Sequence, residues 1–146
     1  MATLAIVGAG RGLGAAVARR FGREGFSIAL ISRDQAKLDA LAERLESEGV
    51  TARGYSADVR DGAALEAALT AAAKDLGPIT ALQYSPLPAR AYLEPVLDLT
   101  PELALDALSF SALGLITAAR TVLPAMREAG EGTIILINGG TSLKAR

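Results

Sequence analysis

A glycine-rich stretch near the start of the chain constrains its fold more than any other feature. It follows the apolar run at residues 3–7 and reads Gly8-Ala9-Gly10-Arg11-Gly12-Leu13-Gly14. A short, nearly continuous apolar run is typical of a strand buried on both faces. After the glycines, Leu13, Val17 and Phe21 recur every four residues, which predicts one stripe of an amphipathic helix. The sequence therefore predicts a strand, a glycine turn and a helix in succession.

Such a turn is suited to binding a phosphate or pyrophosphate group. Glycines allow backbone N–H groups to approach a ligand closely. The helix behind them adds unpaired N–H groups and the positive end of its dipole. A glycine turn without a ligand is the alternative that the spacing alone leaves open.

The composition describes one ordinary globular domain spanning residues 1–146. The chain is 51% hydrophobic and 21% charged, and its net charge of −1 gives no general attraction to nucleic acid or to an anionic membrane. We find no apolar run near the roughly 18 residues of a membrane span and no signal peptide, so we expect a cytoplasmic protein. Because the chain has neither cysteine nor histidine, disulfides, a histidine-based triad and the usual zinc sites are excluded, and we predict no metal site.

Strands and helices alternate along the rest of the chain. Further strands are predicted at 27–31, 51–57, 79–83 and 133–137, and helices are predicted to begin after Asp34, Asp61 and Thr100. This alternation predicts an α/β fold: a Rossmann-type, doubly wound parallel sheet with strand order 3-2-1-4-5. The weakly apolar third strand suits an edge of that sheet.

The C-terminal side of this fold is expected to be incomplete. The largely apolar run at 133–137 on an open sheet edge would invite aggregation, so we expect further chain or a partner to cover it. The helical stretch 102–129, with a break near 109–114, carries apolar residues on more than one face. Such a helix is buried on two sides, which predicts a homodimer or homotetramer formed through 102–129, or packing on further chain.

The end of the second strand indicates which nucleotide is bound. An acidic side chain there would accept hydrogen bonds from the ribose hydroxyls. The chain has Ser32 and Arg33 instead, and Arg11 lies within the glycine loop. Arginine suits a 2′-phosphate, which favours NADP(H), and Asp34 is interpreted as a helix cap. Gly8-x-Gly10-x-Gly12 also matches many S-adenosylmethionine sites, so a methyltransferase is a weaker alternative. Asp58-Val59, after the third strand, is expected to hold the adenine edge or to form a plain turn.

Taken together, these residues resemble the short-chain dehydrogenase/reductase family along the entire chain. The resemblance rests on Gly8-x-x-x-Gly12-x-Gly14, Asp58-Val59, Gly77-Pro78-Ile79, Leu123-Pro124-x-Met126 and Gly132-Thr133-Ile134-Ile135. It implies an NADP(H)-dependent oxidoreductase that passes hydride between nicotinamide and a small carbonyl or alcohol substrate. The cofactor-binding residues expected on this basis are Gly8, Gly10, Arg11, Gly12, Leu13, Gly14, Ser32, Arg33, Asp58, Val59 and Ser85.

The catalytic side departs from the family pattern. Tyr84-Ser85-Pro86-Leu87 stands where the family has Asn-Asn-Ala-Gly, and Ser111 stands at the helix asparagine. Gly139 aligns with the catalytic serine, and the Tyr-x-x-x-Lys acid/base pair is not within the 146 residues and is expected beyond Arg146. The catalytic candidates are therefore Tyr84, Ser111, Thr141 and Ser142. These departures favour an alternative hypothesis, in which the protein is a non-catalytic NADP(H)-binding sensor or partner subunit.

Overall fold

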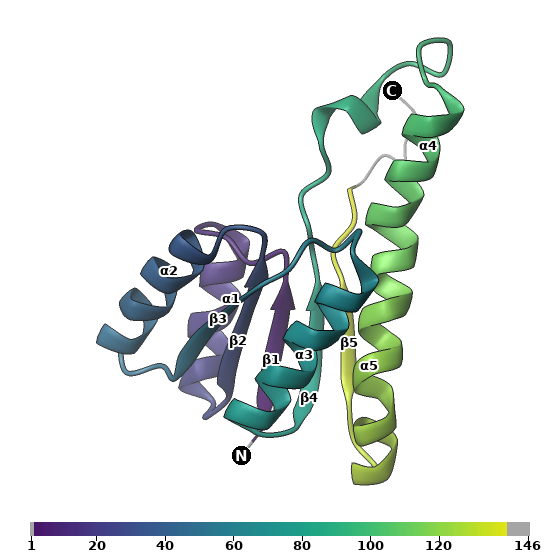
Figure 1. Ribbon diagram of the computed structural model, residues 1–146. Coiled ribbons are helices and arrows are strands. Elements are labelled where there is room, and N and C mark those ends of the chain that lie inside the picture. The colour runs from purple at the N-terminus through teal and green to yellow at the C-terminus, as the bar shows by residue number, and fades with distance from the viewer. Residues whose placement is uncertain (1, 140–146) are drawn as a thin grey trace.

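A five-stranded parallel sheet forms the centre of the protein (Figure 1). The computed structural model describes residues 2–139. Its strands run in the order β3-β2-β1-β4-β5, which confirms the predicted fold class and order. The strands are β1 (Thr3–Val7), β2 (Ser27–Ser32), β3 (Ala52–Ser56), β4 (Ile79–Tyr84) and β5 (Thr133–Leu136).

Helices cover both faces of this sheet, so each strand alternates between two cores. Leu4 and Ile6 of β1 pack toward α1 (Leu13–Arg23) and α2 (Gln35–Ser47). Ala5 and Val7 pack toward α3 (Gly62–Leu76) and α5 (Gly114–Ala129) on the opposite face. Burial on both faces explains why β1, β2 and β4 are apolar almost throughout.

Side-chain caps begin three of the helices where the sequence predicts them. Asp34, Asp61 and Thr100 each accept a hydrogen bond from the backbone N–H three residues later, at 3.1, 3.0 and 3.2 Å. Caps of this kind contribute about 1 kcal/mol each to stability. The cap assignment of Asp34 is confirmed, and Lys37 pairs with the same carboxylate at 3.2 Å.

The predicted apolar stripe of α1 is wrong at its first residue. Leu13 is 52% exposed, whereas the buried residues of this helix are Gly14, Ala15 and Ala18. Small side chains let the helix approach the sheet closely, so the core on this face comes mainly from the strands and α2. Val17 and Phe21 pack only partly against it.

The strands at the two edges differ from one another. Weakly apolar β3 lies at one edge, as predicted, and β5 lies at the other. The regular strand β5 ends at Leu136, one residue earlier than predicted, although the Ile137 amide still donates to the Tyr84 carbonyl at 3.2 Å. Leu136 and Ile137 remain 48% and 44% exposed.

A single helical column continues well past the end of the sheet (Figure 1). It consists of α4 (Pro101–Leu108), the π-helical turn η2 (Ser109–Leu113) and α5, so the predicted break is a local widening. With 29 residues, the column is long and apolar enough to cross a membrane by length and composition. The sequence prediction concerned uninterrupted apolar runs, and this column is interrupted by charged residues such as Asp106 and Arg120. One side of α5 nevertheless packs on α3 and β4.

The π turn is explained by a side chain that reaches it from the sheet. The Tyr84 hydroxyl, at the end of β4, donates to the Phe110 carbonyl within η2. A helix carbonyl that accepts a side-chain donor is one cause of a local irregularity in the helix ladder. Gly114, the first residue of α5, leaves room for this hydroxyl, and a Cβ there would also meet the Val59 carbonyl oxygen at 2.8 Å.

This packing predicts that Gly114→Ala destabilises the protein. The added methyl group would overlap the Tyr84 hydroxyl and the backbone of Val59, and overpacking of this kind costs about 1–3 kcal/mol. Thermal unfolding monitored by circular dichroism should show a lower Tm. The matched control is Gly62→Ala, whose methyl group would lie 3.5 Å from the nearest atom, in the Thr117 side chain. Equal Tm values for the two variants would contradict this account of the helix.

Candidate cofactor site

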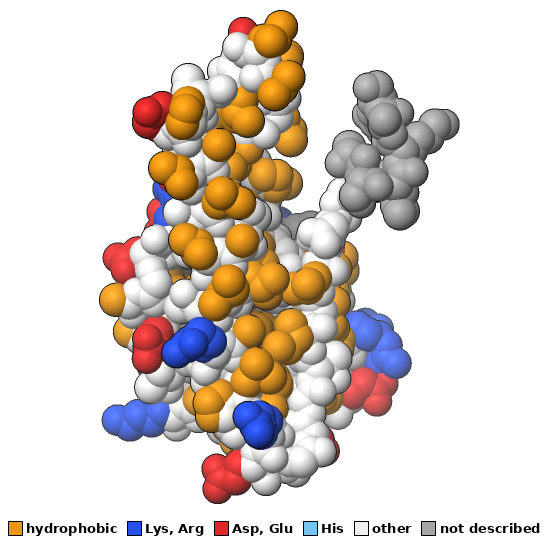
Figure 2. Space-filling model, turned by 90° about the vertical axis from the view of Figure 1, so that its right-hand side faces the viewer, with side chains coloured by type: hydrophobic (Ala, Val, Ile, Leu, Met, Phe, Trp, Pro, Cys, Tyr) orange, Lys and Arg blue, Asp and Glu red, His pale blue; other side chains and the backbone are white. Residues whose placement is uncertain are grey.

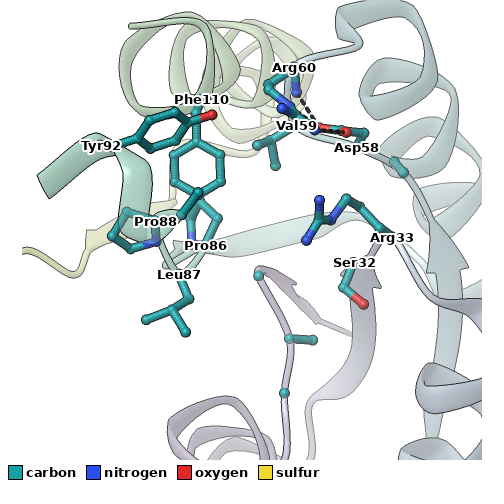
Figure 3. A pocket seen from close by; sticks show the side chains of 15 residues that line it. Ser32, Arg33, Asp58, Val59, Arg60, Pro86, Leu87, Pro88, Tyr92 and Phe110 are labelled. Carbon is teal, nitrogen blue, oxygen red and sulfur yellow. Dashed lines mark hydrogen bonds and ion pairs between the residues drawn. The ribbon is translucent and has the colours of Figure 1, made fainter. Parts of the chain in front are cut away.

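The candidate site lies where the chain leaves the carboxyl ends of the central strands. In an open parallel sheet, the crevice at which the strand order reverses is the usual ligand site, and here it lies between β1 and β4. A cavity of about 430 Å³ occupies this place (Figure 3). Its lining residues are Gly8, Ala9, Gly10, Ser32, Arg33, Ala57, Asp58, Val59, Arg60, Pro86, Leu87, Pro88, Ala89, Tyr92 and Phe110.

The glycine loop is held in place by the end of β2. The Gly8 and Ala9 amides both donate to the Ile31 carbonyl, at 2.9 and 3.0 Å. Gly8 has φ of +92°, and a Cβ there would overlap the backbone of Ser85 and Pro86. Glycine is therefore required at this position both by conformation and by the close approach of the segments that follow β1 and β4.

Two other glycines of the loop keep space open in front of α1. A Cβ built on Gly10 or Gly12 meets no atom within 4 Å. Gly12 is the N-cap of α1 and has no side chain to cap the first amides of the helix. The loop therefore leaves an open cradle at the positive end of a helix dipole, which can receive an anion.

The structure brings together some of the predicted cofactor residues but not all of them. Those that line the cavity are Gly8, Gly10, Ser32, Arg33, Asp58 and Val59. Those outside its lining are Arg11, Gly12, Leu13, Gly14 and Ser85. Arg11 is exposed, Gly14 is buried where an added Cβ would lie 3.3 Å from Ala9 Cα, and the Ser85 hydroxyl accepts a hydrogen bond from the Gln83 amide at 2.8 Å.

Arg33 reaches into the cavity from the end of β2. Its guanidinium lies between Ser32 and the pair formed by Asp58 and Arg60 (Figure 3). Within residues 2–139, no acid lies within ion-pair distance of Arg33. Its donors are therefore available to a ligand with negative charge, such as a phosphate.

Arg60 is a cavity residue that the sequence analysis missed. Its Nη2 lies 2.7 Å from Asp58 Oδ2, its Nε donates to Asp58 Oδ1 at 3.1 Å, and its Nη1 lies 3.3 Å from Asp106 on α4. The hydrogen bond from Arg60 lowers the pKa of Asp58, and these carboxylates raise the pKa of Arg60. The only sequence signal was an Asp-x-Arg spacing at the end of a strand, which is also common in surface turns.

The wall opposite Arg33 comes from the segment that follows β4 and from η2, and the sequence pointed only to Pro86 in it, within Tyr84-Ser85-Pro86-Leu87. Pro86, Pro88 and the rings of Tyr92 and Phe110 form this wall (Figure 3). Tyr92 lies in the short helix η1 (Arg90–Leu93), and its ring lies against Phe110 with centroids 5.5 Å apart. The Tyr92 hydroxyl donates to Asp106, which links this segment to α4 and, through Arg60, to Asp58.

Two of the four catalytic candidates, Tyr84 and Ser111, lie within the described residues. Tyr84 is buried, its hydroxyl is bonded to Phe110, and burial raises its pKa to about 12. Ser111 donates to the Ala107 carbonyl of its own helix at 2.7 Å. Thr141 and Ser142 lie outside the described residues.

A second cavity of about 410 Å³ adjoins the first, and Tyr84 lines this second cavity. The two cavities share Pro86, Pro88, Tyr92 and Phe110. The other residues that line the second are Tyr84, Leu93, Ala107, Ser111, Leu115, Leu136, Ile137, Asn138 and Gly139. Within residues 2–139, no group of three or more acidic side chains is placed to hold a metal ion.

Comparison with known proteins gives one consistent family. The family model described as short chain dehydrogenase matches residues 2–146. The chain is 30% identical to 2,3-dihydro-2,3-dihydroxybenzoate dehydrogenase of Bacillus subtilis, over 94% of the chain and 52% of that protein. It is 33% identical to 2-(S)-hydroxypropyl-CoM dehydrogenase 3 of Xanthobacter autotrophicus, over 90% of the chain and 51% of that protein. The chain thus spans about half the length of these curated relatives.

Solved structures agree with the sequence comparison. A crystal structure of actinorhodin polyketide ketoreductase with NADPH superposes with a TM-score of 0.86 at 29% identity, covering 99% of this chain and 56% of that one. A gluconate 5-dehydrogenase from Burkholderia cenocepacia, in complex with NADP and tartrate, gives a TM-score of 0.85 at 28% identity, with the same coverage.

The environments of the tyrosines predict that their phenols lose a proton at a higher pH than in an unfolded chain. Burial raises the pKa of Tyr84 to about 12, burial and Asp75 raise that of Tyr55 to about 12, and the hydrogen bond to Asp106 raises that of Tyr92. Since these pKa values are higher in the folded state, the stability they contribute is complete below pH 10 and is lost as the pH rises toward about 12. An ultraviolet titration should show later phenolate formation in the folded protein than in urea. A folded-state tyrosine that titrates as it does in urea would contradict the geometry.

Proposed function

The chain belongs to the short-chain dehydrogenase family. We propose that it forms the NADP(H)-binding half of an oxidoreductase. The proposal depends mainly on the position of Arg33. This residue lies in the crevice between β1 and β4, with no acid in ion-pair distance within residues 2–139. The neighbouring strand-end residue is Ser32 rather than an acid, and Asp34 is engaged as a helix cap. A guanidinium and a hydroxyl at this place favour a ribose that carries a 2′-phosphate.

The residues present fit such a cofactor. Gly10 and Gly12 leave the space that a pyrophosphate needs at the start of α1. Asp58 and Val59 line the cavity beyond Arg33, where an adenine would lie, and the Arg60 pair keeps the Asp58 carboxylate ionised and fixed in direction. The solved ketoreductase and gluconate 5-dehydrogenase, which contain NADPH and NADP, support the same assignment.

The chain's own contribution to the reaction would be binding and orientation. When bound, the nicotinamide ring supplies or accepts the hydride that interconverts a carbonyl and an alcohol. The amides of α1 would hold the pyrophosphate, Arg33 and Ser32 the 2′-phosphate, and Asp58 the adenine. Pro86 and Phe110 would exclude water from the opposite wall. The acid/base group of the reaction is not assigned to any residue within 2–139.

A second function is favoured by the hydroxyl groups near the site. Those of Tyr84 and Ser111 are both bonded to backbone carbonyls of the helical column. Groups bonded in this way hold the fold and are poorly placed to move protons to a substrate. A partner subunit or sensor that binds NADP(H) without turnover is therefore the alternative. Cofactor binding by the full-length protein, with no oxidation of NADPH by any carbonyl compound, would select it.

We also propose that the protein forms a homodimer or homotetramer through the helical region 102–129. Hydrophobic side chains form a band along the outer face of the column (Figure 2). Its most exposed members are Leu105, Leu108, Leu113, Ile116 and Leu123, with exposed fractions from 40% to 66%. A band of this kind on a helix that already packs on α3 and β4 is typical of a second buried interface.

The first prediction of this proposal concerns the 2′-phosphate. Arg33→Asp should weaken NADPH binding about 10- to 100-fold, because a charge-assisted hydrogen bond is replaced by repulsion. NADH binding should change much less. Calorimetric titration with both cofactors measures the effect, and Arg44→Asp, on the exposed surface of α2 outside the cavity, is the matched control. Equal losses for NADPH and NADH would disprove the phosphate contact.

The second prediction concerns the glycine cradle. Gly12→Val should reduce binding of both NADPH and NADH by at least tenfold, because its side chain occupies the space that the pyrophosphate needs. The same space meets no protein atom within 4 Å of a Cβ, so the protein should still fold. Circular dichroism spectra and titration of the same sample measure both effects. A folded variant that binds normally would show that the cradle is not the site.

A further inference from the structure

The cavity that contains Arg33 also contains a carboxylate, that of Asp58. Both residues line the first cavity, and the Arg33 guanidinium lies between Ser32 and the pair formed by Asp58 and Arg60 (Figure 3). A carboxylate in this place has two effects that oppose the binding of a 2′-phosphate. It competes with the phosphate for the donors of Arg33, and its negative charge repels the phosphate. The selection of NADPH through Arg33 therefore depends on what holds Asp58.

Arg60 holds this carboxylate by three hydrogen bonds. Its Nη2 donates to Asp58 Oδ2 at 2.7 Å, and its Nε and backbone N–H donate to Asp58 Oδ1 at 3.1 and 3.0 Å. A carboxylate oxygen has two lone pairs, so Oδ1 is fully engaged and Oδ2 keeps one position for a ligand. A two-point pair between a guanidinium and a carboxylate also fixes the direction of both groups. Asp58 is therefore held toward Arg60 rather than toward Arg33.

The guanidinium of Arg60 is itself engaged on both sides. Its Nε and Nη2 bind Asp58, and its Nη1 lies 3.3 Å from a carboxylate oxygen of Asp106 on α4. The positive charge of Arg60 thus faces two carboxylates, whereas Arg33 has no acid in ion-pair distance within residues 2–139. A phosphate that enters the cavity is therefore expected to bind Arg33 and not Arg60.

Arg33 and Asp58 are close enough to attract one another through their charges. The hydrogen bond from the Arg60 side chain lowers the pKa of Asp58 most, and the charge of Arg33 lowers it as well. Opposite charges in one cavity attract whether or not they form a direct pair. Loss of the Arg60 side chain would leave Asp58 free to turn and bind Arg33.

We propose that Arg60 is a positioning residue that sets the selectivity for the 2′-phosphate without contacting it. It balances the charge of Asp58 and holds this carboxylate away from Arg33, so the donors of Arg33 stay available to the phosphate. The inference rests on the proposed function, because it requires a cofactor in the first cavity with its 2′-phosphate at Arg33. It differs from a direct contact in that the effect of Arg60 passes through Asp58.

Calorimetric titration with NADPH and with NADH tests the proposal through the ratio of the two affinities. Arg60→Gln should lower the preference for NADPH about tenfold, because the released Asp58 competes for Arg33 and repels the phosphate. A contact between Asp58 and the adenine is common to both cofactors, so its disturbance cancels in the ratio. Arg60→Gln combined with Asp58→Asn should restore the original ratio, since a neutral amide neither neutralises Arg33 nor repels the phosphate.

Arg53→Gln is the matched control, because Arg53 pairs with Asp75 at 3.0 Å outside the cavity. It removes the same charge and one ion pair and should leave the ratio unchanged. Arg60 lies outside both cores, so its variants should fold, which circular dichroism checks. An unchanged ratio in Arg60→Gln, an equal fall in Arg53→Gln, or a ratio that stays low in the double variant would overturn the proposal. An unmodified protein with no preference for NADPH would reject the proposed function, and this inference with it.

Discussion

Two hydrogen bonds to a single carbonyl set the geometry on which the site depends. The Gly8 and Ala9 amides both bind the Ile31 oxygen, so the chain that leaves β1 is fixed to the end of β2. Only a glycine can then pass the backbone of Ser85 and Pro86 after β4. The remaining glycines turn the chain into α1 and leave the helix start open. The crevice, the open and positive N-terminus of α1 and the position of Arg33 all follow from this junction.

Much of the fold could be predicted because local signals and burial agree. Asp34, Asp61 and Thr100 begin helices as their side chains indicate, and the apolar strands are buried on both faces. The prediction was wrong for Leu13 because the spacing of large apolar residues ignores the small ones. Gly14, Ala15 and Ala18 form the buried face instead, where a close helix–sheet contact excludes bulk.

The candidate site could be predicted only where it depends on sequence-local geometry. Gly8, Gly10, Ser32, Arg33, Asp58 and Val59 follow strand ends, and the structure places them in one cavity. Arg60, Tyr92 and Phe110 come from separate segments and meet through hydrogen bonds and ring contacts between distant residues. No spacing along the chain encodes such contacts. The π turn is a similar case, because Tyr84, whose hydroxyl binds the Phe110 carbonyl, lies 26 residues earlier than Phe110.

We propose that the crevice between β1 and β4 selects a nicotinamide cofactor with a 2′-phosphate. Calorimetric titration of the unmodified protein with NADPH and then with NADH measures this selectivity. We expect micromolar binding of NADPH and at least tenfold weaker binding of NADH, because the donors of Arg33 lie in the cavity with no protein acid in ion-pair distance within residues 2–139. Equal affinity for the two cofactors, or a folded protein that binds neither, would contradict it.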